Sequence, residues 1–377
     1  MRSEAGVHSK GKDTTSICRV MVVDDSAIAR GIVTRALSEE PDIRVVASVP
    51  NGLMALKALG NQEIDVAVLD IEMPELDGLS ALPRMLEIDP QLKIIMVSAA
   101  SQNDADISLK TMAMGAADYV EKPKAGLGGA GAFYAELVRK VRQHGSAEKR
   151  KQAMPRMGRQ ARTSPQNAAP VTAPITSRNK IFPKPDVIAI GSSTGGPQAL
   201  AEVLKALDPS LTQPILITQH MPATFTGLLA QHMTRYSGRL AAEAQEGERI
   251  EPGRIYIAPG GKHLVVERAV AGGIIIRLDD GPAENSCKPA VDPMLRSLAR
   301  IVGDRLLTII LTGMGSDGLK GCEAVVHAGG HVLAQDRETS VVWGMPGAVA
   351  QAGLCSEILP LQQIGPAIMR IAGGEGK

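Results

Sequence analysis

Short runs of β-branched and other aliphatic residues alternate with longer stretches of helical periodicity, and this alternation constrains the possible folds strongly. Runs that are apolar at every position suit strands buried on both faces of a parallel sheet. The helical stretches supply the crossover connections that parallel strands require. The first such runs are Val20–Val23, Ile43–Ala47, Val66–Leu69, Ile94–Val97 and Tyr119–Val120. We therefore expect a doubly wound α/β domain over residues 19–144.

The same alternation resumes at Asp186 and continues toward the end of the chain. Helical stretches again separate most of the apolar runs, so these runs also suit parallel strands. The expected strands are Val187–Ile190, Ile215–Thr218, Arg254–Ala258, Ile274–Leu278, Leu306–Leu311 and His331–Ala334. We therefore expect a second doubly wound parallel-sheet domain over residues 186–377. A chain of 377 residues is long enough for two such domains.

Two segments show no periodic apolar face. Residues 145–185 begin with several Lys and Arg and continue as a Pro/Ala/Thr-rich stretch, a composition typical of a flexible linker. The basic half also fits a patch for nucleic acid or acidic lipid, but its interspersed charges favour a solvated tether. Residues 1–18 are polar and charged and lack the apolar core of a signal peptide, so we expect a disordered tail.

The composition argues against several classes of protein. With 41 Lys and Arg against 40 Asp and Glu, the formal charge of +1 provides no general attraction for nucleic acid. Aromatic residues make up only 2% of the chain, which is too few for base-stacking surfaces. No apolar run approaches the roughly 18 residues of a membrane-spanning helix. We expect a soluble, cytoplasmic protein that binds no nucleic acid and does not insert into membranes.

Acidic residues follow two strands of the first predicted domain. Asp24 and Asp25 follow the first strand and Asp70 ends the third, so all three are expected at the carboxyl edge of the sheet. Their mutual repulsion is relieved by a hard cation, and an oxygen-only site suits Mg²⁺. A carboxylate balanced in this way can attack a phosphoryl group. Ser98 and Lys122, at the ends of the fourth and fifth strands, offer a hydroxyl and a cation to the phosphoryl oxygens.

Each of these residues has an ordinary explanation when it is taken alone. A paired Asp-Asp is usually a helix cap or a solvated loop, and a single Ser or Lys at a strand end is usually surface. Their joint placement at four strand ends favours a site. Here the sequence resembles the response-regulator receiver family, through the motifs Val22-Val23-Asp24-Asp25-Ser26, Leu69-Asp70-Ile71-Glu72-Met73-Pro74, Val97-Ser98-Ala99 and Gly115-Ala116-Ala117-Asp118-Tyr119-Val120-Glu121-Lys122-Pro123.

This resemblance spans residues 19–144 and implies a flavodoxin-like receiver domain. It implies that Asp70 is the phosphoacceptor and that Ser98 and Lys122 contact the phosphoryl group. The Mg²⁺ ligands that it implies are Asp24, Asp25, Asp70 and the backbone carbonyl of Glu72.

A serine lies on a glycine-rich turn at the start of the second predicted domain. The segment Gly191-Ser192-Ser193-Thr194-Gly195-Gly196 lies between the strand Val187–Ile190 and a helix that opens at Pro197. Such a turn presents a side chain at the sheet edge beside the N–H groups of a helix start, and Gly191-x-Ser193-x-Gly195 matches the nucleophile-elbow pattern. Two alternatives stay open for this motif alone: a chance match, or a turn that only holds phosphate. The glycines lack the following Lys of a P-loop.

A base and an orienting acid are expected at two other strand ends. His220 follows the strand Ile215–Thr218 and can take the proton of Ser193. Asp317 follows the strand Leu306–Leu311 and can orient the His220 ring. A histidine at a strand end is often only a structural hydrogen bonder, and Asp317 also fits an N-cap of the next helix. Their convergence with Ser193 favours a triad, in a chain order different from that of the α/β-hydrolases.

Other candidate residues carry weaker signals. His263 fits a pocket-lining position. Cys287 fits a second nucleophile, but no paired base is evident from the sequence, so a buried or rim thiol is favoured. No two cysteines form a CxxC pair, so neither a disulfide framework nor a zinc site is expected from Cys18, Cys287, Cys322 and Cys355.

Residues 186 to about 372 resemble the catalytic domain of the chemotaxis protein-glutamate methylesterases, so the whole chain resembles the CheB family. The motifs that carry this second resemblance are Ile190-Gly191-Ser192-Ser193-Thr194-Gly195-Gly196, Thr218-Gln219-His220-Met221-Pro222, Cys287-Lys288-Pro289-Ala290-Val291-Asp292, Leu311-Thr312-Gly313-Met314-Gly315-Ser316-Asp317-Gly318, Ala334-Gln335-Asp336 and Val342-Trp343-Gly344-Met345-Pro346. The resemblance implies a Rossmann-like methylesterase domain in which Ser193, His220 and Asp317 are catalytic.

The implied activity is hydrolysis of methyl esters on glutamate side chains of chemotaxis receptors, with deamidation of receptor glutamines. The backbone of Met314 belongs to the implied active-site lining, and we expect the region of Thr194, Gly195 and Met314 to stabilise the oxyanion. No cofactor or metal is expected for this half. The implied partners are the receptors and a chemotaxis histidine kinase as phosphodonor, and we expect a monomer.

The resemblance also implies that the resting receiver domain covers the face of Ser193 and that phosphorylation releases it. The alternative from another class is a receiver-controlled binding module that holds a phosphorylated or acidic ligand and catalyses nothing.

Overall fold

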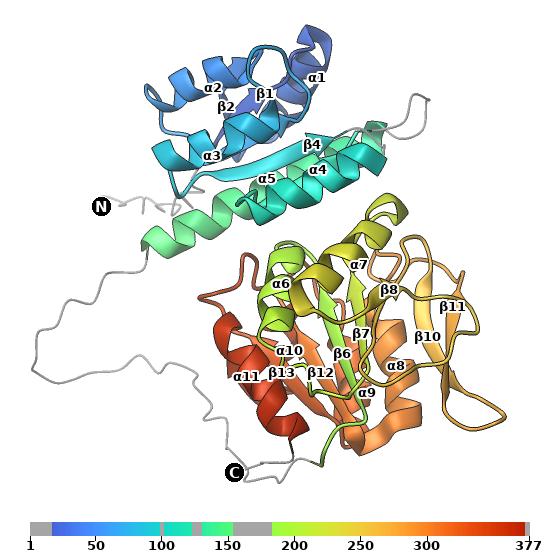
Figure 1. Ribbon diagram of the computed structural model, residues 1–377. Coiled ribbons are helices and arrows are strands. Elements are labelled where there is room, and N and C mark those ends of the chain that lie inside the picture. Colours follow the sequence, from blue (N-terminus) through green and yellow to red (C-terminus); the bar gives the residue numbers. More distant parts are fainter. Residues whose placement is uncertain (1–16, 99–101, 123–129, 154–182, 374–377) are drawn as a thin grey trace, which may run out of the picture.

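A computed structural model of the chain describes residues 17–98, 102–122, 130–153 and 183–373. Figure 1 shows two layered α/β units, each with helices on both faces of a sheet. The first unit contains β1 (Cys18–Val23), α1 (Ala27–Ser38), β2 (Ile43–Val49), α2 (Gly52–Leu59), β3 (Val66–Asp70), α3 (Gly78–Ile88), β4 (Lys93–Ser98), α4 (Gln102–Ala113), β5 (Asp118–Glu121) and α5 (Ala130–Ala153).

The second unit begins at Val187 and ends with a helix close to the end of the described residues. Its elements are β6 (Val187–Ser192), α6 (Gly196–Lys205), β7 (Ile215–Gln219), α7 (Ala223–Ser237), β8 (Ala241–Glu243), β9 (Ile255–Ile257), β10 (His263–Arg268), β11 (Ile274–Asp279), α8 (Val291–Val302), the 3₁₀ turn η1 (Gly303–Arg305), β12 (Leu306–Ile310), α9 (Leu319–His327), β13 (His331–Gln335), α10 (Met345–Gln351), β14 (Glu357–Leu359) and α11 (Leu361–Ala372).

The first sheet is parallel, with the strand order β2-β1-β3-β4-β5. Successive residues of β1 enter two different cores: Val20 and Val22 pack with residues of α1 and α5, whereas Met21 and Val23 pack with residues of α2, α3 and α4. Both faces of β1 are therefore buried, which is why its residues from Val20 to Val23 are all apolar. The strand order reverses between β1 and β3, and ligands bind at the carboxyl ends of strands at such a switch point.

Two boundaries of the first unit differ from the sequence prediction. Strand β1 begins at Cys18, which the sequence pattern places in the N-terminal tail; the thiol is buried against Gly145 like an apolar side chain. Helix α5 continues to Ala153, into the segment expected to be a linker. The last turns consist mainly of Ala, Glu, Lys, Arg and Gln, which are strong helix formers, so the helix continues there. The remaining expected tail and linker, 1–16 and 154–182, lie outside the described residues.

The second sheet is also parallel, with the order β14-β13-β12-β6-β7-β9-β8. Along β6, Ile188 and Ile190 pack with residues of α6, α7 and α11, whereas Val187 and Ala189 pack with residues of α8, α9 and α10. The strand order reverses between β6 and β12, so the expected ligand edge lies at the carboxyl ends of these two strands. The prediction of two doubly wound parallel-sheet domains is confirmed.

One predicted strand of the second unit does not belong to the parallel sheet. The run Ile274–Leu278 corresponds to β11, but this strand pairs with β10 in a separate antiparallel hairpin. A tight turn containing Gly272 and Gly273, both with positive φ, joins the two strands, and so short a connection permits only antiparallel pairing. The prediction also missed β8, β10 and β14, of which β8 and β14 are three-residue strands at the sheet edges.

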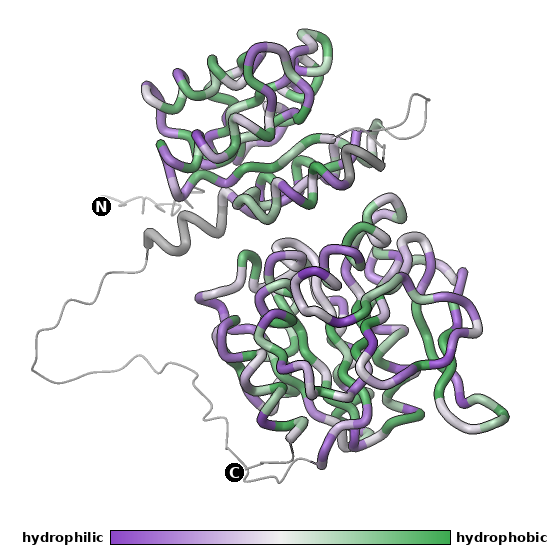
Figure 2. Tube along the Cα trace, in the orientation of Figure 1, coloured by the Kyte–Doolittle hydropathy of each residue, from purple (hydrophilic) through white to green (hydrophobic). Residues whose placement is uncertain are grey.

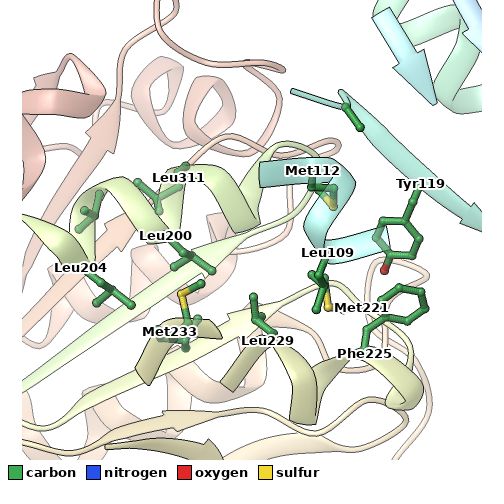
Figure 3. Packing of buried hydrophobic residues seen from close by; sticks show 14 of the residues in the cluster. Leu109, Met112, Tyr119, Leu200, Leu204, Met221, Phe225, Leu229, Met233 and Leu311 are labelled. Atoms are coloured by element: carbon green, nitrogen blue, oxygen red, sulfur yellow. The ribbon is translucent and has the colours of Figure 1, made fainter. Parts of the chain in front are cut away.

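The two units pack together through α4 and β5 of the first and α6 and α7 of the second (Figure 1). The rings of Tyr119 and Phe225 stack with their centroids 4.4 Å apart. Leu109, Met112 and Met221 lie beside them, as Figure 3 shows. One buried hydrophobic cluster therefore continues from the core of the first unit into the core of the second.

Hydrophobic residues, green in Figure 2, are frequent on the strands inside both units. Among the described residues, no helix combines the length and the apolar character needed to cross a membrane. The buried hydrophobic residues lie in the cores around the two sheets and in the contact between the units.

A polar contact also joins the two units. The Gln198 side chain, at the start of α6, donates through Nε2 to the carbonyl oxygens of Met112 at 2.8 Å and Ala116 at 2.9 Å. We expect Gln198→Glu to weaken the contact between the units, because a carboxylate would face two carbonyl oxygens without a donor. The radius of gyration from small-angle scattering should rise, whereas the control Gln362→Glu, on the exposed surface of α11, should leave it unchanged. Equal radii for all three proteins would contradict this.

Candidate active site and phosphorylation site

The predicted acids of the first unit meet at its switch point. Carboxylate oxygens of Asp24, Asp25 and Asp70 lie within 4.8 Å of one another, with Asp24 and Asp70 buried and Asp25 exposed. Lys122 follows β5, and its Nζ lies 2.8 Å from Asp70 Oδ2 and 3.3 Å from Asp24 Oδ2. The structure therefore brings these four predicted residues into one cluster.

The charge distribution of this cluster suits a divalent cation. Burial raises the pKa of Asp70 to about 6; the Lys122 ammonium lowers it and the Asp24 charge adds to the rise. The single ammonium group offsets only part of the charge of three neighbouring acids. A set of oxygen donors with an exposed member fits Mg²⁺, which keeps several water ligands.

Ser98 and Glu72 lie at the same sheet edge. The buried hydroxyl of Ser98, at the end of β4, has no hydrogen-bond partner within the described part of the chain. It is therefore free to bond an incoming phosphoryl oxygen. Glu72 and Asp25 line a cavity of about 500 Å³ beside the acids. Coordination by the Glu72 carbonyl stays a prediction.

The glycine turn of the second unit has the strand-turn-helix form that the motif predicts. Strand β6 ends at Ser192 and α6 begins at Gly196. Gly195 has φ +74°, a left-handed conformation that favours glycine. At Gly196 a Cβ atom would lie 1.9 Å from Gln219 Oε1, so only glycine permits this approach. These two glycines allow the chain to turn sharply at the carboxyl end of β6.

The two serines of the turn have different surroundings. Ser192 is fully buried and its Oγ donates to Gln219 Oε1 at 2.6 Å. Ser193 is partly exposed and lines a cavity of about 1110 Å³ that opens between the two units. Gln219 Nε2 donates to the carbonyl oxygens of both Ser193 and His220, at 2.9 and 3.1 Å, and so holds the two segments together. Gln219 was not predicted from the sequence, although a buried amide in an apolar strand is a signal for such a role.

His220 and Asp317 form a direct pair. His220 Nε2 lies 2.7 Å from Asp317 Oδ2, and the exposed fractions of the two side chains are 11% and 2%. His220 follows β7, and Asp317 lies in the loop between β12 and α9, so both follow strands that pair with β6. The doubly wound order thus places the predicted base and acid next to the turn of Ser193.

Asp317 is held by the start of another helix. Its oxygens accept from the backbone N–H groups of Val291 at 2.6 Å and Asp292 at 3.2 Å, the first two residues of α8. They also accept from Gly318 N at 3.0 Å and from Asn285 Nδ2 at 2.9 Å. The alternative of a simple cap on the following helix α9 does not describe this residue, because its carboxylate binds the N-terminus of α8. Asn285 was not predicted from the sequence, because it has no motif signal in its loop.

The pair has perturbed protonation equilibria. Burial alone would lower the pKa of His220, but the hydrogen bonds to Asp317 and Cys287 outweigh it and raise the pKa to about 9. Burial would raise the pKa of Asp317, yet the bond to His220 and the N–H donors of α8 hold it below its usual range. Asp317 therefore stays ionised and favours the protonated form of His220.

The second nitrogen of His220 contacts a thiol. Nδ1 lies 3.3 Å from Cys287 Sγ and is a base that was not evident from the sequence, while the thiol lies at the rim of the cavity as expected. The partner was missed because His220 and Cys287 are brought together only by the fold. No hydrogen bond joins the Ser193 hydroxyl to His220 in the described residues; such catalytic contacts are often longer before substrate binds.

The predicted oxyanion region lies beside Ser193. The backbone N–H groups of Thr194, Gly195 and Met314 donate to no acceptor within the described ranges. Gly313, which precedes Met314, packs against Ser193 so closely that a Cβ atom would lie 2.9 Å from that residue. The Sδ atom of Met314 also accepts a hydrogen bond of 2.8 Å from Nη1 of Arg139 in the first unit.

His263 does not line this cavity. Its ring is buried, with Nε2 3.0 Å from the Pro282 carbonyl oxygen, and its Nδ1 accepts from Ala290 N at 3.1 Å. Both ring nitrogens are thus used to tie loops together, and the expectation of a pocket position is corrected to a structural one.

Comparisons with known proteins agree with this arrangement. Residues 20–126 match the response regulator receiver domain, and residues 188–368 match the CheB methylesterase family. The chain is 40% identical to the crystal structure of the Thermotoga maritima CheB methylesterase catalytic domain, covering 50% of this chain and 98% of that one with a TM-score of 0.48. It is 33% identical to the response regulator domain of Thermotoga maritima CheB, covering 34% and 97% with a TM-score of 0.32.

Two curated relatives match nearly the whole chain, and both are named protein-glutamate methylesterase/protein-glutamine glutaminase. One, from Azospirillum brasilense, is 55% identical, covering 97% of this chain and 95% of its own. The other, from Paramagnetospirillum magneticum, is 53% identical, covering 97% and 99%. With this identity over both units, the protein belongs to the CheB methylesterase family and joins a response-regulator receiver domain to a methylesterase domain.

Proposed function

We propose that this protein removes methyl esters from glutamate side chains of chemotaxis receptors and deamidates receptor glutamines, under the control of its receiver domain. The names of its relatives support the activity. The observation that carries the mechanism is the buried His220–Asp317 pair, of which His220 lines the same cavity as Ser193. A chemotaxis histidine kinase is the proposed phosphodonor.

The first chemical step is acyl transfer to Ser193. Its Oγ attacks the ester carbonyl carbon while His220 takes the hydroxyl proton. Because Nε2 is bonded to Asp317, the nitrogen that receives this proton is Nδ1. The N–H groups of Thr194, Gly195 and Met314 then stabilise the oxyanion. The tetrahedral intermediate collapses, methanol leaves with the proton from His220, and an acyl-serine remains.

Water completes the reaction by the same route. His220 takes a proton from water, the hydroxide attacks the acyl-serine, and Ser193 recovers its proton as the glutamate carboxylate leaves. A glutamine side chain can follow the same path with ammonia as the first leaving group. We propose no metal for this half of the protein.

The acid cluster of the receiver domain is the proposed site of phosphorylation. We propose that Asp70 accepts the phosphoryl group and that Asp24, Asp25 and Asp70 hold Mg²⁺, with the Glu72 carbonyl as a further ligand. When bound, the ion offsets the charge of the acids and of the phosphoryl oxygens. Ser98 and Lys122 contact these oxygens from the ends of β4 and β5.

The docked receiver restricts access to Ser193. Residues of β5 and α5 form one wall of the 1110 Å³ cavity, and Arg139 contacts Met314 directly. We propose that phosphorylation shifts the population from docked to open. Gln198→Glu should accordingly raise methanol release by the unphosphorylated full-length protein toward the phosphorylated level. An unchanged resting rate in a variant with an enlarged radius of gyration would contradict control by occlusion.

A non-catalytic binding module is not favoured, since relatives that match both domains are named as enzymes. Methanol release from methylated receptor, measured with and without a phosphodonor, distinguishes the esterase from the binding module. A monomeric state and a cytoplasmic location stay predictions.

Substitution of each serine of the turn shows which of the two is the nucleophile. Ser193→Ala should lower methanol release by about 10³-fold or more, because no other oxygen can form the acyl-enzyme. Ser192→Ala is the matched control: it removes one hydrogen bond to Gln219, worth about 0.5–1.5 kcal/mol of stability, and should keep most of the activity. Loss of activity in Ser192→Ala alone would show that the nucleophile is Ser192.

The rate should depend on pH through His220. The ring accepts a proton only when neutral, and its pKa is raised to about 9, so kcat/KM should rise from neutrality to about pH 9. Asp317→Asn removes the main partner that raises this pKa, so the rising limb should move to lower pH while the plateau falls by about 10²–10⁴-fold. The measurement is the pH profile of methanol release, corrected for uncatalysed hydrolysis. A flat wild-type profile between pH 6.5 and 9 would refute the assignment.

Phosphorylation should require Asp70 and a divalent cation. Asp70→Asn should incorporate no phosphate from labelled acetyl phosphate, and excess chelator should block incorporation by the wild type. Asp77→Asn is the control, because Asp77 lies at the same edge but only caps α3, which asparagine also does. Normal stoichiometry in Asp70→Asn would place the phosphoacceptor elsewhere.

A further inference from the structure

Cys287 completes a second nucleophile–base arrangement around His220. Its Sγ lies 3.3 Å from Nδ1, while Nε2 of the same ring is bonded to Asp317. A thiol, an imidazole and a carboxylate in this order form the arrangement that produces a reactive thiolate in cysteine hydrolases. Cys287 has no assigned part in the ester hydrolysis described above.

The loop around Cys287 holds the thiol in place and leaves it accessible. Its backbone exchanges two hydrogen bonds with Glu284, at 2.8 and 3.1 Å. Asn285, which precedes Cys287 by two residues, is tied to Asp317 and Asp292 through its side-chain amide. The Cys287 side chain is half-buried and lines the open cavity between the two units. Small molecules that enter the cavity can therefore reach the sulfur.

The other three cysteines differ from Cys287 in burial or in pKa. Cys18 and Cys322 are buried, with exposed fractions of 5% and 0%. Cys355 is half-buried, but burial raises its pKa to about 12, so its thiolate is scarce at neutral pH. Two thiols are thus half-buried, Cys287 beside a base and Cys355 with a raised pKa, so Cys355 provides an internal control.

We propose that Cys287 is a site of reversible oxidation by hydroperoxides and that its oxidation switches the esterase off through His220. The reactive form is the thiolate: the Cys287 proton passes to solvent, while protonated His220 keeps its own proton on Nδ1, so the thiolate lies beside an imidazolium. The thiolate sulfur attacks the outer oxygen of the hydroperoxide, the O–O bond breaks, and water or an alcohol leaves after taking a proton. The sulfur loses two electrons and becomes a sulfenic acid, and the peroxide is reduced.

The oxidised sulfur blocks the base. A sulfenic oxygen on Cys287 would occupy the position next to Nδ1, the nitrogen that must receive the Ser193 proton. This consequence rests on the proposed function of His220, whereas the oxidation itself does not. Low-molecular-weight thiols reverse the change: one thiol forms a mixed disulfide and releases water, and a second restores the cysteine.

The test compares full-length wild type with Cys287→Ser and the matched control Cys355→Ser. Each protein is treated with hydrogen peroxide, divided, and either assayed for methanol release or labelled with dimedone, which traps sulfenic acids, for peptide mass spectrometry. Activities are expressed relative to the same protein untreated. A second portion is assayed after dithiothreitol.

Wild type and Cys355→Ser should lose activity about tenfold or more, since a general base contributes about 10²–10⁴-fold. Dithiothreitol should restore it, and the dimedone label should lie on Cys287. Cys287→Ser should keep its own untreated activity through the same treatment. Cys287→Ala provides a second variant if the serine protein is unstable.

Three results would overturn the proposal. The first is absence of label on Cys287. The second is equal inactivation of Cys287→Ser, which would indicate oxidation of a methionine such as Met314, a change that dithiothreitol does not reverse. The third is label on Cys287 without loss of activity, which would refute the switch. If untreated wild type released no methanol, the proposed function would fail, and the label would still decide whether Cys287 is oxidised.

Discussion

The buried carboxylate of Asp317 connects the elements that form the esterase site. It receives hydrogen bonds from the first two N–H groups of α8, from the Asn285 side chain and from His220. A carboxylate at a helix N-terminus is stabilised by the helix dipole and by otherwise unpaired N–H groups, so it stays ionised although it is buried. This anchor orients the His220 ring through Nε2, and in the proposed mechanism it leaves Nδ1 to receive the Ser193 proton.

The contact between the two domains is the basis of the control that we propose for the same site. Tyr119 and Phe225 stack within a hydrophobic cluster that belongs to both domains, while Gln198 and Arg139 add polar contacts at its margin. Tyr119 lies on β5, three residues before Lys122, which contacts the Asp70 carboxylate. A change of charge at Asp70 therefore acts close to the residues that hold the domains together. This short path is the physical basis that we propose for coupling phosphorylation to access at Ser193.

Much of the architecture and most candidate site residues were predictable because parallel sheets impose a simple rule. Buried strands are apolar throughout, and their carboxyl ends meet at one edge. Polar residues directly after such strands, including Asp24, Asp70, Ser193 and His220, therefore indicate a shared site from the order of residues alone. The rule fails where a turn replaces a helix, as between β10 and β11, because an apolar run alone does not reveal which partner a strand will have.

The sequence by itself determined the two doubly wound domains, the acid cluster and the approximate position of the triad, because these depend on periodicity and on strand ends. Only the tertiary structure decided the contacts made by loops. Cys287 contacts His220, and Asn285 donates to Asp317. Gln219 accepts a hydrogen bond from the Ser192 hydroxyl and donates one to the Ser193 carbonyl oxygen, which leaves the two serines in different surroundings. The loop residues follow no repeating pattern, and Gln219 does not reveal its partners, although a polar residue in an apolar strand is a local signal. The partners in all three cases are set by how helices and strands pack around these residues.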